Sequence, residues 1–285
     1  MYETVEAFYR PATVSEALKL LQKGKGTAKI VAGCTDAIIE PAPDIRVLID
    51  ITRAGLNYIR KRDGAWSIGA TTTMSEIEES AQMCTLAGGL LALAAGSCGG
   101  VEIRNMATIG GNMANGSPAA DLATPLLALD ASAVVAVPRA RRKIPLPEYL
   151  KSQPPNSILV ELTFPDPPRG RHTGWSFQKL GRTAVDISLV NVAAGLGLDA
   201  RHRVKWARVA LGAVGPAPLR ITSAEALLTG HTLDRVLLAE VAEAVSREVQ
   251  PITDVRATAG YRREMAAVLT RKSLEECAEQ AECAL

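Results

Sequence analysis

Residues 107–121 read ATIGGNMANGSPAAD, a run of small and polar residues between two less polar segments. Its paired glycines, Gly110 and Gly111, can adopt backbone angles closed to other residues and let a ligand approach the main chain. The short amide and hydroxyl side chains that follow can add hydrogen bonds. The pattern is typical of a loop that binds phosphate, although a glycine turn with an Asp cap has the same appearance.

An apolar segment follows this stretch directly. Residues 121–129 predict a helix, whose free N–H groups would point back at a bound anion. Asp121 stands at its start, where a carboxylate suits a ribose hydroxyl or a helix N-cap better than a phosphate. The helix therefore supports an anion site, and Asp121 is the candidate for a ribose contact.

A second glycine-containing turn lies upstream. Residues 29–36 read KIVAGCTD, an apolar strand that ends in glycine and small polar residues. Two such loops can close on one long anion from opposite sides, and the pyrophosphate of a dinucleotide has that shape. A Rossmann nicotinamide site is disfavoured, because the G-x-G-x-x-G pattern within a βαβ unit is missing.

The segments VAGCTDA and TIGGNMANGSPAAD resemble the two FAD-binding loops in the flavin subunit of the molybdenum hydroxylases, the family of the xanthine and carbon monoxide dehydrogenases. The resemblance runs nearly end to end and in the same order. One departure is Cys34, where the first loop commonly carries a second glycine, and its side chain narrows the loop. The other matching segments are EAFYRPATVSEALKLL, FQKLGRTAVDISLVNVAA, ALGAVGPAPLR and YRREMAAVLTRKSLEE.

The resemblance implies an α+β fold. Residues 1–168 would form a two-subdomain FAD-binding domain of the vanillyl-alcohol-oxidase/PCMH type, split near residue 55. Residues 171–285 would form the C-terminal domain, an antiparallel sheet with helices. The length of 285 residues is ample for two domains. The proline-rich segment 165–170 is the best boundary candidate, with a surface loop inside one domain as the alternative.

Matched position by position, the resemblance implies FAD contacts in both loops and beyond them. Backbone N–H groups of the first loop would surround the diphosphate. Lys179, in FQKLGR, matches a family lysine near the flavin ring, where a cation can stabilise reduced, anionic flavin. The implied FAD contacts are Lys29, Val31, Ala32, Gly33, Cys34, Thr35, Asp36, Thr108, Gly111, Asn112, Asn115, Ala120, Asp121, Leu159 and Lys179.

Cysteine and histidine usage limits what the chain can do alone. The five cysteines form no C-x-x-C pair and the three histidines lack ligand spacing, so neither a disulfide framework nor a metal site is expected. Neither loop contains a histidine for covalent attachment, so FAD should be held noncovalently. The resemblance implies a large molybdenum-cofactor subunit and a small subunit with two 2Fe-2S clusters as partners, assembled as a dimer of heterotrimers.

Composition excludes other classes of partner. The chain has 32 basic and 30 acidic residues, and a net charge of +2 favours neither nucleic acid nor an anionic membrane surface. The only dense basic group, Arg139 to Lys143, is interpreted as a solvated loop. No apolar run approaches the roughly 20 residues that span a bilayer, and the N-terminus lacks the apolar core of a signal peptide. A cytoplasmic location is therefore expected.

The expected function is that of an oxidoreductase subunit with no catalytic residue of its own, whose FAD passes electrons from the 2Fe-2S clusters to a terminal acceptor. Cys98 falls where NAD-using animal xanthine dehydrogenases place an aromatic residue, which favours an acceptor other than NAD, although Tyr261 could cover the ring instead. A stand-alone flavin oxidoreductase and a non-catalytic nucleotide-binding protein stay open as alternatives. The partner surface is expected around Arg104 or on the helices after Leu233.

Local patterns predict further elements. Capping boxes at Thr13–Glu16 and Thr73–Glu76 each predict a helix start, and Asp63-Gly64 predicts a hairpin turn. A helix is expected over about residues 85–95. Short apolar bursts after residue 170 predict an antiparallel sheet, followed by helices.

Overall fold

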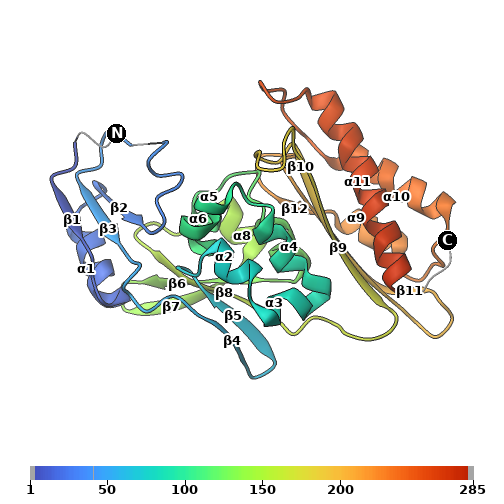
Figure 1. Ribbon diagram of the computed structural model, residues 1–285, viewed down its shortest axis with the longest axis horizontal. Helices are drawn as coiled ribbons and strands as arrows, with labels where there is room; N and C mark the ends of the chain where they lie inside the picture. Colours follow the sequence, from blue (N-terminus) through green and yellow to red (C-terminus); the bar gives the residue numbers. More distant parts are fainter. Residues whose placement is uncertain (1–3, 41, 282–285) are drawn as a thin grey trace. The chain divides into compact units, whose positions relative to one another are not determined.

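The computed structural model describes residues 4–40 and 42–281, which form two compact units. The chain passes between them several times. Unit 1 holds the chain up to Glu76 together with Gly100–Asn115 and Asp130–Asp166, and unit 2 holds Ile77–Gly99, Gly116–Leu129 and the chain from Pro167 onward. Figure 1 labels the elements of both units.

Unit 1 contains a small parallel sheet with strand order β1-β3-β2. Helix α1 connects β1 to β2 and packs against both β2 and β3. It begins at the predicted capping box, where Thr13 Oγ1 accepts the Glu16 N–H at 3.2 Å. The elements are β1 (Ala7–Tyr9), α1 (Val14–Lys23), β2 (Ala28–Val31) and β3 (Val47–Asp50).

The second sheet of unit 1 is antiparallel, with strand order β4-β5-β8-β6-β7. The predicted hairpin turn is confirmed, since Asp63 and Gly64 both have positive φ, 49° and 74°. The second capping box is also confirmed, because Thr73 N–H donates to Glu76 and Glu76 N–H to Thr73. The elements are β4 (Ile59–Arg62), β5 (Ala65–Gly69), α2 (Met74–Glu78), α5 (Val101–Met106), α6 (Ile109–Ala114), β6 (Ser132–Val137), β7 (Ala140–Pro145), α8 (Leu146–Lys151) and β8 (Ile158–Pro165).

Two local expectations were wrong. The basic group from Arg139 to Lys143 is exposed as expected, but most of it forms edge strand β7 rather than a loop, because it pairs with β6. The helix expected over residues 85–95 is broken by Ala87, Gly88 and Gly89, whose φ values are 48°, 62° and 81°. Two glycines favour this left-handed break, and helix α4 (Leu90–Gly96) starts only after it.

Unit 2 is built on an antiparallel sheet with strand order β12-β11-β10-β9. Every residue of β10 is buried, so both faces of the sheet are covered at this strand. Helix α11 packs on β9 and β10 (Figure 1), and the element contacts place α7 on β10 and β11. The elements are α3 (Ala81–Thr85), η1 (Leu86–Gly89), α4 (Leu90–Gly96), α7 (Ala123–Ala128), β9 (Thr173–Leu180), β10 (Val190–Leu198), β11 (Val204–Gly212), β12 (Leu219–Arg220), α9 (Thr222–Leu228), α10 (Arg235–Glu248) and α11 (Ala259–Gln280).

The expectation of an α+β fold with an antiparallel sheet and helices after residue 170 is confirmed. Small residues in β10 explain how two indole rings fit on this sheet. A Cβ at Gly195 would lie 2.3 Å from the Trp175 ring, and one at Gly197 would lie 2.2 Å from Trp206. The two rings pack together, with centroids 5.2 Å apart.

Candidate functional site

The first predicted loop follows β2 and lies against the chain that leads into the second. A Cβ at Gly33 would come within 1.7 Å of the Met106 carbonyl oxygen, so only glycine allows this approach. Met106 is two residues before Thr108, the first residue of the second predicted segment. The two segments are therefore neighbours within unit 1, as a shared ligand requires.

Backbone donors are free at this turn. In the part of the chain that the structure describes, no acceptor takes the N–H groups of Gly33, Cys34 or Thr35. Cys34 has a φ of 60°, in the left-handed region that glycine favours, and it stands where the resemblance leads us to expect a second glycine. Successive N–H groups in a turn with a left-handed residue form a concavity that binds anions. The turn fits a diphosphate.

Burial and neighbouring charges affect the pKa of two side chains in this turn, Cys34 and Asp36. Burial raises the pKa of the Cys34 thiol, and Asp50 raises it further, while Lys29 acts in the opposite direction. The thiol therefore stays neutral near pH 7, and Cys34 Sγ donates to the Ala32 carbonyl at 3.4 Å. Burial and Glu40 likewise raise the pKa of Asp36, against the pull of Lys29.

The glycine pair of the second predicted loop lies in a helix, α6, and this corrects the expectation of an open backbone there. The N–H groups of its first turn are used, since Ile109 donates to the Thr72 carbonyl at 3.0 Å and Gly110 to the Ala70 carbonyl at 2.9 Å. The Gly111 N–H donates to the Oγ1 of Thr108, which caps the helix.

The two glycines of this helix have different roles. A Cβ at Gly110 would lie 2.5 Å from the Ala70 carbonyl oxygen, so this glycine serves packing inside unit 1. Gly111 is exposed, and so is Asn115, one turn later on the same helix. Asn112 is half-buried, and Leu159, on β8, is a buried core residue. The surface of α6 thus offers Gly111 and side-chain amides rather than free backbone N–H groups.

The helix expected at residues 121–129 exists as α7 (Ala123–Ala128). All six of its residues are buried, because the apolar sequence packs against β10 and β11. Asp121 does not cap it, since the N-cap position is Leu122 and no side chain caps the helix. Asp121 is therefore not an N-cap, and the anion contact of this helix stays a prediction.

Asp121 instead lies at the centre of a buried polar cluster in unit 2. Its Oδ2 accepts from Lys179 Nζ at 2.9 Å, and its Oδ1 accepts from Ser188 Oγ at 2.6 Å. Asn191 Nδ2 lies 3.0 Å from Ser188 Oγ and 3.4 Å from Asp121 Oδ1. Lys179 Nζ also donates to the Ser97 carbonyl at 2.7 Å. We refer to Asp121, Lys179, Ser188 and Asn191 as the Asp121 cluster.

The carboxyl of Asp121 is the group of this cluster whose pKa burial affects. Burial raises the pKa of Asp121, while the positive charge of Lys179 and the hydrogen bond from Ser188 act against that rise. The charge of Lys179 and the hydrogen bond from Ser188 together offset the free-energy cost of burying the Asp121 carboxylate. Sequence reasoning found Asp121 and Lys179 but missed Ser188 and Asn191. The available signal was a polar Asn191 inside the apolar run of β10.

The other predicted site residues fall in both units. Residues 29–36, 108–115 and Leu159 belong to unit 1, whereas Ala120, Asp121 and Lys179 belong to unit 2. Among the residues described, no group of three or more His, Cys, Asp or Glu side chains could hold a metal ion. Within the same ranges, no helix combines the length and apolar character that crossing a bilayer requires.

Two family models match the chain in succession. The model of the FAD binding domain in molybdopterin dehydrogenase matches residues 3–167, and that of the CO dehydrogenase flavoprotein C-terminal domain matches residues 175–277. The first alone covers more than half of the chain.

Known relatives match over nearly their whole length. The chain is 33% identical to the xanthine dehydrogenase FAD-binding subunit of Escherichia coli O157:H7 over 281 residues, covering 95% of each protein. It is 32% identical to subunit alpha of the 6-hydroxypseudooxynicotine dehydrogenase complex of Paenarthrobacter nicotinovorans, covering 94% of this chain and 93% of that one.

The fold of a solved structure matches that of this chain over its whole length. A chain of the carbon monoxide dehydrogenase of Hydrogenophaga pseudoflava, in a form that lacks the Mo-pyranopterin moiety, superposes with a TM-score of 0.92 at 28% identity, covering 100% of both chains. The expected fold class, flavin-domain architecture and cofactor are thereby confirmed. Because both family models, a relative 33% identical over 95% of its length and a solved structure agree, this chain belongs to the FAD-binding subunits of the molybdopterin dehydrogenases and is an oxidoreductase component.

Proposed function

We propose that this chain is the electron-transfer subunit of a heteromeric molybdenum hydroxylase. A large partner subunit oxidises the substrate at a molybdenum cofactor, and a small partner subunit relays the electrons through 2Fe-2S clusters to the FAD of this chain. FAD exchanges one or two electrons and so links one-electron clusters to a terminal acceptor. The observation that carries the proposal is the row of free N–H donors from Gly33 to Thr35, in a chain whose relatives are FAD-binding subunits.

The first loop is proposed to hold the FAD diphosphate. The free N–H groups donate to its oxygens, and Lys29 adds positive charge on the strand that leads into the turn. The further predicted contacts of this loop are Val31, Ala32 and Asp36. Along α6, the proposed contacts are Thr108, Gly111, Asn112 and Asn115, and beyond it Ala120 and Leu159.

The Asp121 cluster is proposed to serve the ribose and ring parts of FAD. A carboxylate offers about four lone-pair sites, and Lys179, Ser188 and Asn191 occupy three of them. One site remains for a ribose hydroxyl. Lys179 uses two donors on Ser97 and Asp121, and a lysine has three, so one N–H can face a reduced flavin.

The partner arrangement and the acceptor extend the same proposal. The names of the two relatives above refer to different substrates, xanthine and 6-hydroxypseudooxynicotine. We therefore assign the choice of substrate to the partner chain and not to this one. We propose a dimer of heterotrimers in the cytoplasm, with noncovalent FAD and a domain boundary near residues 168–171. Cys98 in place of an aromatic residue supports an acceptor other than NAD, such as a quinone or a protein carrier.

Co-purification from the native source tests the proposed function. The chain should elute with a large subunit containing molybdenum and a small subunit containing iron. Adding the oxidisable substrate should bleach the flavin absorption of the complex and leave that of the isolated chain unchanged. Turnover of the substrate by the isolated chain, free of iron and molybdenum, would show a stand-alone oxidoreductase instead. A purified chain without flavin that binds none on addition would favour the non-catalytic alternative.

A further inference from the structure

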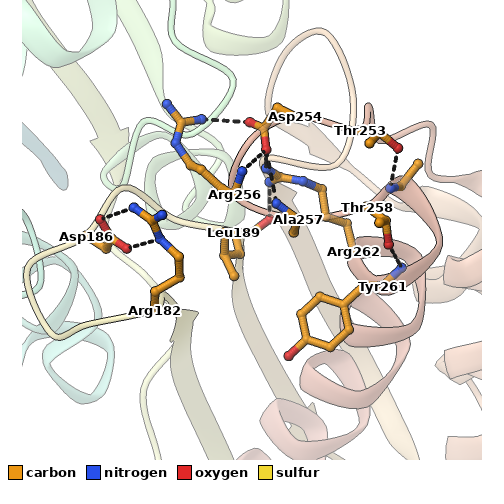
Figure 2. A network of polar contacts seen from close by, with 11 residues as sticks. Arg182, Asp186, Leu189, Thr253, Asp254, Arg256, Ala257, Thr258, Tyr261 and Arg262 are labelled. Carbon is orange, nitrogen blue, oxygen red and sulfur yellow. Dashed lines mark hydrogen bonds and ion pairs between the residues drawn. The ribbon is translucent and has the colours of Figure 1, made fainter.

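A network of charged side chains holds the end of the segment that carries Ser188 (Figure 2). Residues 181–189 connect β9 to β10, and both backbone groups of Leu189 are held. Its N–H donates to the Leu180 carbonyl at 2.8 Å, and its carbonyl accepts from Arg262 at 2.6 Å. Arg262 lies in the first turn of α11, so this helix fixes the end of a connection 73 residues earlier in the chain.

Arg262 is itself held in a defined orientation. It is 3% exposed, and its second terminal nitrogen donates to Asp254 Oδ1 at 2.8 Å. Asp254 accepts in turn from the N–H groups of Arg256 and Ala257 and from the Arg256 side chain. A planar guanidinium can bridge the Leu189 carbonyl and the Asp254 carboxylate at once, whereas a lysine ammonium lacks this fork.

Stability alone does not account for an arginine at this position. The Nε of Arg262 is buried and, within the described ranges, has no hydrogen-bond partner. A buried donor left unpaired costs free energy, and apolar replacements of buried ion pairs are often neutral or stabilising. The contact that an apolar side chain could not supply is the one to the Leu189 carbonyl.

Leu189 is adjacent to the Asp121 cluster in the chain. Ser188 precedes it and Asn191 follows two residues later, and these two side chains bond each other and Asp121. The position of the Leu189 carbonyl therefore determines where the Ser188 hydroxyl lies relative to Asp121 Oδ1.

We propose that Arg262 is a positioning residue: by holding the Leu189 carbonyl, it keeps the Ser188 hydroxyl on Asp121 and so sets how strongly Asp121 neutralises Lys179. This inference rests on the proposed role of Lys179 beside FAD. When Ser188 donates to Asp121, this hydrogen bond offsets part of the carboxylate's negative charge. The carboxylate then cancels less of the electrostatic effect that the positive charge of Lys179 has on reduced flavin. Without that hydrogen bond, the Asp121 carboxylate offsets more of the positive charge of Lys179, and reduced flavin loses stabilisation.

One arm of the test needs no flavin. Hydrogen exchange is measured on the full chain carrying Arg262→Gln, with Arg263→Gln as the control, because Arg263 is exposed on the same helix turn. The Leu189 amide, which donates to the Leu180 carbonyl, should exchange about tenfold faster or more in Arg262→Gln, because loss of the Arg262 bond to the Leu189 carbonyl lets this end of the connection open more often. In Arg263→Gln its exchange should be unchanged. Unchanged exchange at Leu189 in Arg262→Gln overturns the proposal.

The second arm measures the midpoint potential of bound FAD in the assembled complex. Arg262→Gln and Ser188→Ala should each lower it, and the double variant should lower it no further than the larger single change, because both act through one hydrogen bond. When Lys179→Met is already present, adding Arg262→Gln should cause no further change in the midpoint potential, because the proposed effect acts through Lys179. Additive shifts, or an equal shift in that background, overturn the proposal.

Two further variants keep the test decisive if Arg262→Gln does not fold. Arg262→Lys retains the charge with a single contact and should lower the potential less than Arg262→Gln. Asp254→Asn removes the orienting carboxylate and should shift the potential in the same direction. A wild-type chain without FAD overturns this inference together with the proposed function, whereas a wild-type chain with FAD and no shift in these variants overturns this inference alone.

Discussion

The Nζ of Lys179 lies 2.9 Å from the Oδ2 of Asp121, and both side chains are only 8% exposed. A buried pair of this kind has lost most of its hydration, which its mutual attraction must offset. The hydrogen bonds from Ser188 to Asp121 and from Lys179 to the Ser97 carbonyl replace part of the hydration that both charges have lost. The burial of each charge of this pair therefore depends on the presence of the other.

Lys179→Met should destabilise the chain by about 3–5 kcal/mol, because it leaves the Asp121 carboxylate buried without its counter-charge. Adding Asp121→Asn to this variant should restore much of the loss. Urea unfolding provides the measurement. Arg247→Met is the control, since the Arg247–Glu243 pair is 69% exposed on both sides and its loss should cost about 1 kcal/mol or less. Equal losses in Lys179→Met and Arg247→Met would contradict the prediction.

Gly33→Ala should abolish FAD binding, because the new Cβ would come within 1.7 Å of the Met106 carbonyl oxygen and displace the turn. FAD content is measured from the absorption of flavin released by acid. Gly260→Ala is the matched control, since a Cβ there meets nothing within 4 Å and FAD content should stay unchanged. Full FAD content in Gly33→Ala would show that the turn does not hold the cofactor.

Cys34→Gly should leave FAD content unchanged and stability equal or up to about 1 kcal/mol higher, because glycine relieves the left-handed backbone at φ 60° while adding freedom to the unfolded chain. Cys34→Val should lower both, since a β-branched residue is poorly suited to this conformation. Thermal unfolding and flavin release give the two values. A Cys34→Val chain as stable as the wild type would argue against the strain.

Asp254 should contribute to the acid stability of unit 2. Hydrogen bonds from the Arg256 backbone and the Arg262 side chain lower the pKa of its carboxyl to about 2. A lowered pKa adds stability that is present above the ordinary value of 3.8 and is lost as pH falls toward 2.

Comparison of two variants isolates this contribution. In unfolding curves recorded between about pH 5 and pH 2, Asp254→Asn should flatten the loss of stability that the wild type shows, because it has no proton to take up. Asp44→Asn, at an exposed aspartate in unit 1, serves as the control. Identical pH profiles for Asp254→Asn and the wild type would be inconsistent with the lowered pKa.

The sequence by itself determined the features that depend on close neighbours along the chain. The capping boxes of Thr13 and Thr73 and the turn at Asp63-Gly64 involve residues at most three positions apart, and the structure confirms all three. The two loop motifs and the matching segments were likewise enough to identify the family and its cofactor. Short-range hydrogen bonds and backbone preferences leave a readable pattern in the sequence.

Only the tertiary structure decided which polar groups are free to bind. The first-turn donors of α6 are consumed by Thr72 and Ala70, residues 37 and 40 positions earlier in the chain, so a segment that looks like an open loop is a capped helix. Asp121 finds Lys179 and Ser188 58 and 67 residues away, and Arg262 reaches Leu189 across 73. Such pairings form because a buried polar group without a partner costs free energy, and which partner is near depends on how the sheet and helices pack.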